Sequence, residues 1–156
     1  MFTYKWDSYQ VGKNEVILQH SILDRDFGIH SHDFTELVII IGGEGNHIIQ
    51  DKSYALQKGD VYVIAGDISH GYEKTKKLEH INILFHPEVL LLEDIRKEMK
   101  GYRAMFEIEP LYRMENDFGA KLTLEDFQIS EIKKITNEIL SRSETRTTEN
   151  RIIVQT

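Results

Sequence analysis

The densest group of residues able to do chemistry is the segment His30-x-His32-x-x-x-Glu36, with His70 further along the chain. Residues two apart on an extended strand point to the same face, so His30 and His32 are expected to face one space, and Glu36 shares their parity. His70 must come from another strand. Three imidazoles and one carboxylate suit a first-row divalent metal such as Zn, Fe, Ni or Mn. We therefore predict that these side chains converge.

The same residues also fit functions without a metal. They could line a ligand pocket, or they could serve only as structural hydrogen-bonding partners. Residue types and spacing leave all three interpretations open. The remaining histidines lie at no matching spacing and are assigned no role: His20, His47, His80 and His86.

Two aromatic residues join this group as candidate ligand contacts. Phe34 shares the parity of the histidines and can line the same cavity. Trp6 lies in an N-terminal arm with Tyr4 and Tyr9, and an aromatic face stacks well on the apolar side of a sugar ring. Packing of the arm against the body of the protein is the alternative. The predicted ligand-binding residues are His30, His32, Phe34, Glu36, His70 and Trp6.

Up to residue 87, the segments that must position these residues are predicted to be β-strands. Short runs rich in β-branched and aromatic residues alternate with turn signals, and Gly42-Gly43-Glu44-Gly45 predicts a hairpin turn. Closely spaced strands with no helical pattern between them favour an antiparallel sandwich or barrel. The predicted strands include Glu15–Leu23, Glu36–Ile41, Asn46–Gln50, Asp60–Ile64 and His80–Phe85.

Beyond residue 87 the apolar residues follow a helical period. One helix is expected over 88–99, and a second begins at Thr123 as its N-cap. The apolar stripe of the second helix is too wide for a coiled-coil seam alone, so part of it is expected to dock on the barrel and part to meet a second subunit. We predict a barrel domain over 1–87 and a helical dimerisation region over 88–156, with these interface residues: Ile129, Ile132, Ile135 and Ile139.

Composition narrows the class of protein. The 156 residues fit one compact unit with a short appendage, and the absence of cysteine excludes disulfides and thiolate sites. A formal net charge of −7 makes the chain alone a poor partner for nucleic acid. With no signal peptide and no apolar run of about 20 residues, we expect a soluble cytoplasmic protein without a membrane partner. The sequence ends within an apolar run, Arg151–Thr156, which indicates a fragment.

These motifs resemble those of the cupins. The segment from His30 to Glu36, followed by Gly43, is similar to the first cupin motif, and the segment from Gly59 to His70 is similar to a degenerate second one. Ala65, Asp67 and Lys74 stand where that second motif has Pro, Gly and Asn. The resemblance implies a mainly β fold, a double-stranded β-helix or jelly-roll barrel, followed by C-terminal α-helices.

A narrower resemblance, to the effector-binding domain of AraC-type transcription regulators, covers nearly the whole chain. It adds Tyr54-x-Leu56-x-x-Gly59-Asp60-Val61, His70-x-Tyr72 and the segment 101–110 before the amphipathic helix. It implies a non-enzymatic homodimer that binds a small-molecule effector, often a sugar, and requires no cofactor. DNA would be bound by a C-terminal helix-turn-helix region beyond this fragment. The alternative is a metal-dependent cupin enzyme, an isomerase or dioxygenase, with its metal on His30, His32, Glu36 and His70.

Overall fold

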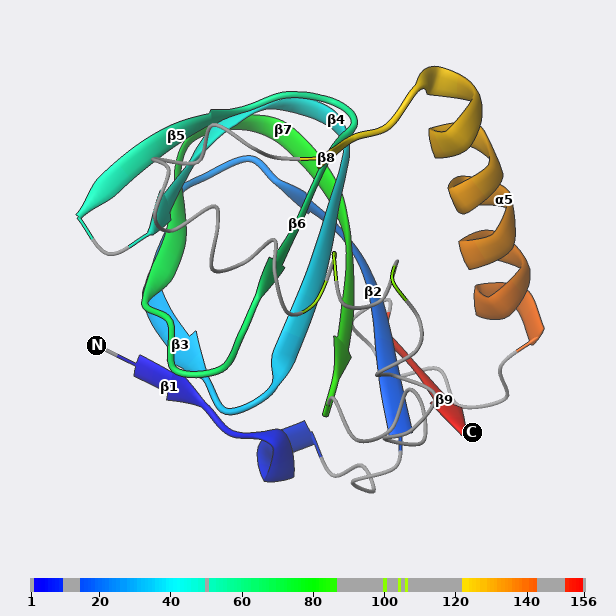
Figure 1. The fold of residues 1–156 in the computed structure, drawn as a ribbon, viewed down its shortest axis with the longest axis horizontal. Coiled ribbons are helices and arrows are strands. Elements are labelled where there is room, and N and C mark those ends of the chain that lie inside the picture. Colours follow the sequence, from blue (N-terminus) through cyan, green and yellow to red (C-terminus); the bar gives the residue numbers. More distant parts are fainter. Residues whose placement is uncertain are drawn as a thin grey trace.

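A computed structural model of the chain describes residues 2–9, 15–49, 51–86, 100, 104, 106, 122–142 and 151–155. Its strands form one nine-stranded sheet that curls round on itself (Figure 1). The strands are β1 (Phe2–Tyr4), β2 (Glu15–Leu23), β3 (Phe27–His32), β4 (Thr35–Ile49), β5 (Lys52–Leu56), β6 (Asp60–Ile64), β7 (His70–Phe85), β8 (Leu122–Thr123) and β9 (Arg151–Gln155). The helical elements with described bounds are the 3-10 helix η1 (Trp6–Tyr9) and the α-helix α5 (Asp126–Arg142).

Two long antiparallel strands, β4 and β7, hold the sheet together. They pair from Thr35 opposite Phe85 to Ile49 opposite His70. On its other edge β7 pairs with β3 near its start and with β2 near its end. The two ends of β4 likewise pair with β6 and β5. Because each long strand bends and changes partner along its length, the sheet closes into a barrel (Figure 1).

The glycine-rich segment is a set of bulges within β4, and the predicted hairpin turn is wrong. Pairing with β7 shifts register on both sides of Gly42 and before Asn46. Gly43 has a positive φ of 76°, and a Cβ there would collide with the backbone of Lys77. Glycine marks bulges as well as turns, and a bulge lets a long strand bend without ending. The predicted strand Glu36–Ile41 and the described part of the predicted strand Asn46–Gln50, up to Ile49, are therefore parts of one strand.

Alternate residues of β4 are buried on opposite faces of the sheet. Val38 and Ile40 belong to a cluster inside the barrel, together with Tyr62, Tyr72 and Leu78. Their neighbours Ile39 and Ile41 belong to an outer cluster that includes Leu18, Val61, Ile81 and Ile129. Both faces of this strand are thus covered, which explains why its sequence is a continuous apolar run instead of an alternating one.

Helix α5 covers the outer cluster. It begins at Asp126, three residues later than predicted, because Thr123 pairs with Asp60 as part of β8. Of the predicted dimer-interface residues, Ile129 is only 3% exposed and packs on its own barrel, which corrects its assignment. Ile132 and Ile139 are partly buried against the same cluster. Ile135 is 56% exposed.

Several sequence predictions fall outside the described residues, namely the helix over 88–99 and most of the segment 101–110. The division of the chain at residue 87 stays a prediction. Two strands from beyond it join the barrel sheet, since β8 pairs with β6 and β9 pairs with β2. In the described part of the chain, no helix combines the length and apolarity needed to cross a membrane.

Candidate functional site

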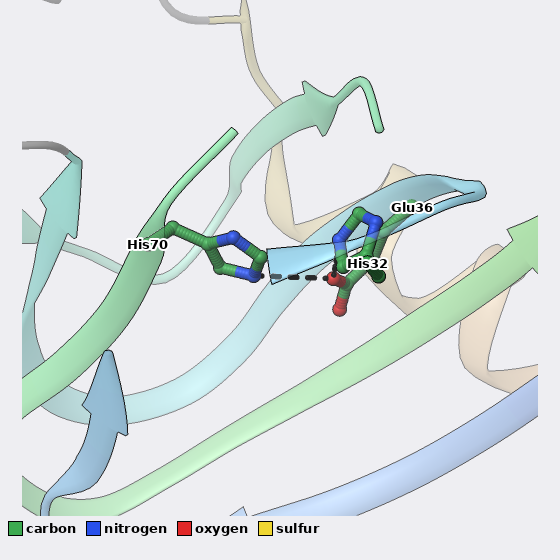
Figure 2. Close-up of side chains that lie close together, drawn as sticks. All are labelled: His32, Glu36 and His70. Atoms are coloured by element: carbon green, nitrogen blue, oxygen red, sulfur yellow. Dashed lines mark hydrogen bonds and ion pairs between the residues drawn. The ribbon is translucent and has the colours of Figure 1, made fainter. Parts of the chain in front are cut away.

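Three of the predicted residues meet in a buried cluster (Figure 2). His32 ends β3, Glu36 follows near the start of β4, and His70 begins β7. The Oε2 atom of Glu36 lies 3.1 Å from Nε2 of His32 and 3.5 Å from Nε2 of His70. The three side chains are almost wholly inaccessible, and their candidate ligand atoms all lie within 4.8 Å of one another. The predicted convergence of these residues is therefore present in the structure.

Strand pairing brings the fourth predicted residue beside them. His30 is directly opposite His70 in the β3–β7 pair, and the centroids of the two rings are 4.2 Å apart. The His30 ring is 6.4 Å from that of His32, and its nitrogens are not within the close group of ligand atoms. His30 thus flanks the cluster and does not complete it.

The orientation of all three imidazoles is fixed by the backbone. Each Nδ1 lies within hydrogen-bond distance of a carbonyl oxygen two residues away, and a carbonyl can only accept, so each Nδ1 carries the proton. In the neutral ring, Nε2 then presents a lone pair. The pairs are His30 with Gly28 at 2.9 Å, His32 with Phe34 at 2.7 Å and His70 with Ile68 at 2.9 Å.

The negative charge of Glu36 must be balanced within a buried cluster. Burial penalises the ionised carboxylate, but hydrogen bonds and positive charge from His32 and His70 outweigh burial and hold the pKa of Glu36 below its usual range. Burial, reinforced by the charge of His70, lowers the pKa of His30 to about 4. An ionised Glu36 facing a ring nitrogen at 3.1 Å needs a proton or a metal cation between the two atoms.

The donor set fits a divalent cation. Its members are two imidazole nitrogens, each oriented by a bond through the other ring nitrogen, and one carboxylate oxygen, as Zn, Ni, Fe or Mn would require. The contact between Nε2 of His70 and Oε2 of Glu36 is long, at 3.5 Å. Protonated imidazoles satisfy the same arrangement, so the geometry fits both a metal site and a metal-free polar pocket.

A cavity of about 510 Å³ opens beside the cluster, a size typical of small-molecule sites, which span about 300 to 1,000 Å³. Four of the predicted ligand residues line it, and His70 and Trp6 do not. The N-terminal arm closes one side through Tyr4, Ser8 and Tyr9. The lining residues that matched the prediction are His30, His32, Phe34 and Glu36.

Trp6 holds the arm in place instead of facing the cavity. Its side chain is only 2% exposed and its ring packs edge-on against Phe34 and His86. Its backbone N–H donates to Asp33 Oδ1 at 2.8 Å. The tyrosines on either side of Trp6 in the sequence reach the cavity. The alternative of an arm packed on the barrel therefore describes Trp6 better than contact with a ligand.

Sequence reasoning missed four polar residues on β2 and β7 that line the cavity: Gln19, Ser21, His80 and Asn82. Their alternation was visible in the sequence, but alternation does not tell which face of a strand points inward. That depends on pairing, because Glu36 lies opposite Leu84 of β7. With that register known, the even-numbered residues near the end of β7 face the cavity.

Comparison with known proteins finds a ligand-binding family and transcriptional activators similar to this chain. The 14–106 segment matches the family described as AraC-like ligand binding domain. The HTH-type transcriptional activator RhaR of Escherichia coli is 38% identical over 79 residues, a match covering 50% of this chain and 28% of that protein. RhaR of Shigella flexneri serotype 5b matches with the same identity and coverage. The chain thus spans 28% of the length of these relatives.

Solved structures similar to this chain include two cupins. A cupin-2 domain containing protein from Shewanella frigidimarina has 24% identity and a TM-score of 0.38, with 47% of this chain and 72% of that chain covered. A cupin protein from Bacteroides fragilis has 23% identity and a TM-score of 0.42, with 55% and 75% covered. The curled sheet followed by α5 is the predicted mainly β, cupin-type fold. Since the family match spans more than half of the chain and includes β2 to β7, the chain belongs to the family of AraC-like ligand-binding domains.

Proposed function

We propose that this chain is the sensing part of a transcription regulator, which binds a small effector in the cavity and acts on DNA through a region outside these residues. The observation that carries the proposal is the 510 Å³ cavity lined by polar and aromatic side chains, in a chain of a ligand-binding family. The formal net charge of −7 supports placing the DNA contacts elsewhere. A regulator of this kind works in the cytoplasm and is not an enzyme.

The chemistry of the lining favours a sugar or a related neutral metabolite. Of the lining residues that the structure describes, none is a lysine or an arginine, whereas Glu36 contributes a carboxylate. A carboxylate or phosphate effector would therefore meet a negative group and no permanent cation. Tyr4, Tyr9 and Phe34 offer aromatic faces, which stack on the apolar side of a sugar ring. Such binding requires no cofactor.

A thermal-shift panel of neutral sugars, their uronic acids and their amino sugars tests this function. A ligand that binds only the folded chain stabilises it by about 2.7 kcal/mol at a concentration of 100 times its Kd. We expect at least one neutral sugar to raise the Tm, and Ser21→Phe to abolish the shift by filling the cavity. Ser130→Phe, on the exposed side of α5, is the matched control and keeps the shift. A panel without any stabilising compound would contradict the proposal.

A second candidate, a metal-dependent cupin isomerase or dioxygenase, is supported by the backbone-anchored imidazoles around Glu36. It predicts near-stoichiometric Zn, Ni, Fe or Mn in the purified chain, lost in His32→Gln and retained in His20→Gln, together with a measurable turnover. Elemental analysis and activity assays distinguish the metal-dependent enzyme from the regulator. The regulator proposal predicts instead that EDTA leaves the sugar-induced Tm shift unchanged.

We also propose a homodimer formed through the side of α5 that the barrel leaves uncovered. Phe127 is 65% exposed and Ile135 is 56% exposed, large apolar areas for a helix in water. Light scattering on the double variant Phe127→Asp with Ile135→Asp is expected to give half the molar mass of the wild-type chain. Asn137→Asp, at an exposed position further round the helix from Phe127 and Ile135, keeps the wild-type mass. An unchanged mass in the double variant rules this surface out.

A further inference from the structure

The wall of the cavity formed by β2 and β7 carries a second polar group, separate from the histidine cluster. Gln19 lies opposite Asn82, and Ser21 lies opposite His80. Directly opposed residues of antiparallel strands share a face, with Cβ atoms about 4.5 to 5.5 Å apart. All four line the cavity. We refer to Gln19, Ser21, His80 and Asn82 as the β2–β7 quartet.

One polar atom of the quartet is buried and has no hydrogen-bond partner within the described residues, namely Oδ1 of Asn82. His80, on the same face of β7, is only 3% exposed. Leaving a buried polar group unpaired costs about 1 to 3 kcal/mol. His20 faces outward from the same strand as Ser21, and its Nε2 lies 2.8 Å from Glu79. Asn82 lines the cavity, so its unpaired oxygen belongs to the cavity wall and not to the outer face.

The quartet carries no charge at neutral pH. Amide and hydroxyl groups do not ionise there, and burial lowers the pKa of His80 although the charge of Glu36 and the backbone of Leu78 partly oppose this effect. The atoms that would satisfy the quartet are therefore neutral hydrogen-bond donors and acceptors. Hydroxyl groups fit best, because each one both donates and accepts.

We propose that the β2–β7 quartet is the subsite that selects the effector, by hydrogen bonds with neighbouring hydroxyl groups of an uncharged polyol or sugar. This inference rests on the proposed function and names the residues that give it specificity. A site built to bond a hydroxyl group rejects an analogue without it, because the polar groups of the site are then left unpaired. Specificity thus comes from β2 and β7, outside the histidine motifs.

The stability of the ligand-free chain gives a test that needs no knowledge of the effector. Asn82→Leu replaces an amide whose buried Oδ1 has no partner within the described residues with an apolar group of similar size, so we expect an unchanged or higher Tm. Gln19→Met is a second variant of nearly conserved shape with the same expectation. Asn137→Leu, on the exposed side of α5, is the matched control. A clearly lower Tm in both cavity variants would show that these amides belong to a structural network and would overturn the inference.

Binding of defined sugars gives the second test. D-galactose, 2-deoxy-D-galactose, D-galacturonate, D-xylose and L-fucose are titrated into the wild-type chain, Asn82→Leu and Ser21→Phe. For whichever neutral sugar binds, Asn82→Leu is expected to raise the Kd at least tenfold and to weaken discrimination against the deoxy analogue. If Ser21→Phe abolishes binding but Asn82→Leu retains wild-type affinity, the proposed function stands and this inference fails. If no sugar binds, the proposed sugar function fails, and the ligand-free Tm still decides the role of the quartet.

Discussion

The two faces of the wall made by β2 and β7 differ in polarity: the outer face is apolar, and the inner face carries polar groups. On the outer face, Leu18 and Ile81 pack with Ile129 of α5 in an apolar cluster. On the inner face, their immediate neighbours Gln19 and His80 line a polar cavity. Because strand side chains alternate between faces, one residue step separates the two environments. The outer face thus supplies apolar packing, and the inner face carries the binding that we propose.

The two faces affect the free energy of folding in opposite directions. Apolar burial on the outer face stabilises the fold at about 25 cal/mol per Å² removed from water, whereas unpaired polar atoms on the inner face, such as Asn82 Oδ1, destabilise it. A protein tolerates such groups where they serve a function. Substitutions on the outer face should therefore reduce stability, and substitutions on the inner face should alter pH dependence and binding.

The largest expected effect is on the outer face. Ile129→Ala removes a side chain that is 3% exposed and should lower the free energy of unfolding by about 3 kcal/mol, since such truncations cost about 2 to 5 kcal/mol. Asn137→Ala, at an exposed position on α5 away from Ile135 and Phe127, should change it by less than about 0.5 kcal/mol. Urea denaturation measures both. Equal losses would mean that α5 does not dock as described.

The next effect is at the histidine cluster. Glu36→Gln removes a charged hydrogen-bond acceptor and should cost about 2 kcal/mol at pH 7. The folded pKa of Glu36 lies below its unfolded value, which is about 4.3. Its stabilisation is therefore fully present above that pH and is lost as the pH falls further. The difference in free energy of unfolding between wild type and variant should shrink progressively as the pH falls below about 4.3, whereas the exposed control Glu44→Gln should follow wild type throughout. A constant gap would contradict this cause.

A smaller effect is expected for His80. Its folded pKa is lowered by burial relative to about 6.5 in the unfolded chain, so the unfolded state takes up a proton first. Wild-type stability should fall as the pH drops below about 6.5, and His80→Leu should remove part of that fall. The test compares the free energy of unfolding at pH 7 and pH 5 for both proteins. An identical pH dependence would show that His80 is not buried in a neutral form.

The smallest effect concerns an ion pair at the edge of the α5 contact. Nζ of Lys133 lies 3.7 Å from Oε2 of Glu79, and the two side chains are 39% and 27% exposed. Lys133→Ala should cost about 0.5 kcal/mol, and the difference from the exposed control Lys134→Ala should vanish in 1 M salt, where the Debye length is about 3 Å. A loss that survives high salt would point to packing of the lysine stem instead.

Much of the fold was accessible from the sequence because local patterns are preserved in it. The predicted strands Glu15–Leu23 and Asp60–Ile64 have the bounds of β2 and β6. The residues of the amphipathic pattern predicted after Thr123 form α5. The bulged course of β4 was not accessible, because Gly43 satisfies the requirements of a turn and of a bulge equally well, and the partner backbone at Lys77 decides between them.

Some residues of the candidate site could likewise be predicted from the sequence, and others could not. His32 and Glu36 lie close in sequence, but a bend between β3 and β4 brings them together, not the parity of one regular strand. His70 followed from the second motif, and His30 only flanks the group. Asn82 and His80 lie far from that segment, and only the register of β7 against β2 and β4 places them at the cavity. Trp6 was placed at the ligand by residue type alone, and packing of the arm decided otherwise.

The most direct test of effector binding on the inner face is a side-chain amide NMR titration of the chain with the neutral sugar that raises its Tm most. The amide signals of Gln19 and Asn82 should shift in proportion to occupancy, and those of Gln128 and Asn137 on α5 should stay fixed. Shifts confined to the α5 amides, or no shift at Asn82 at saturation, would contradict binding at the β2–β7 wall.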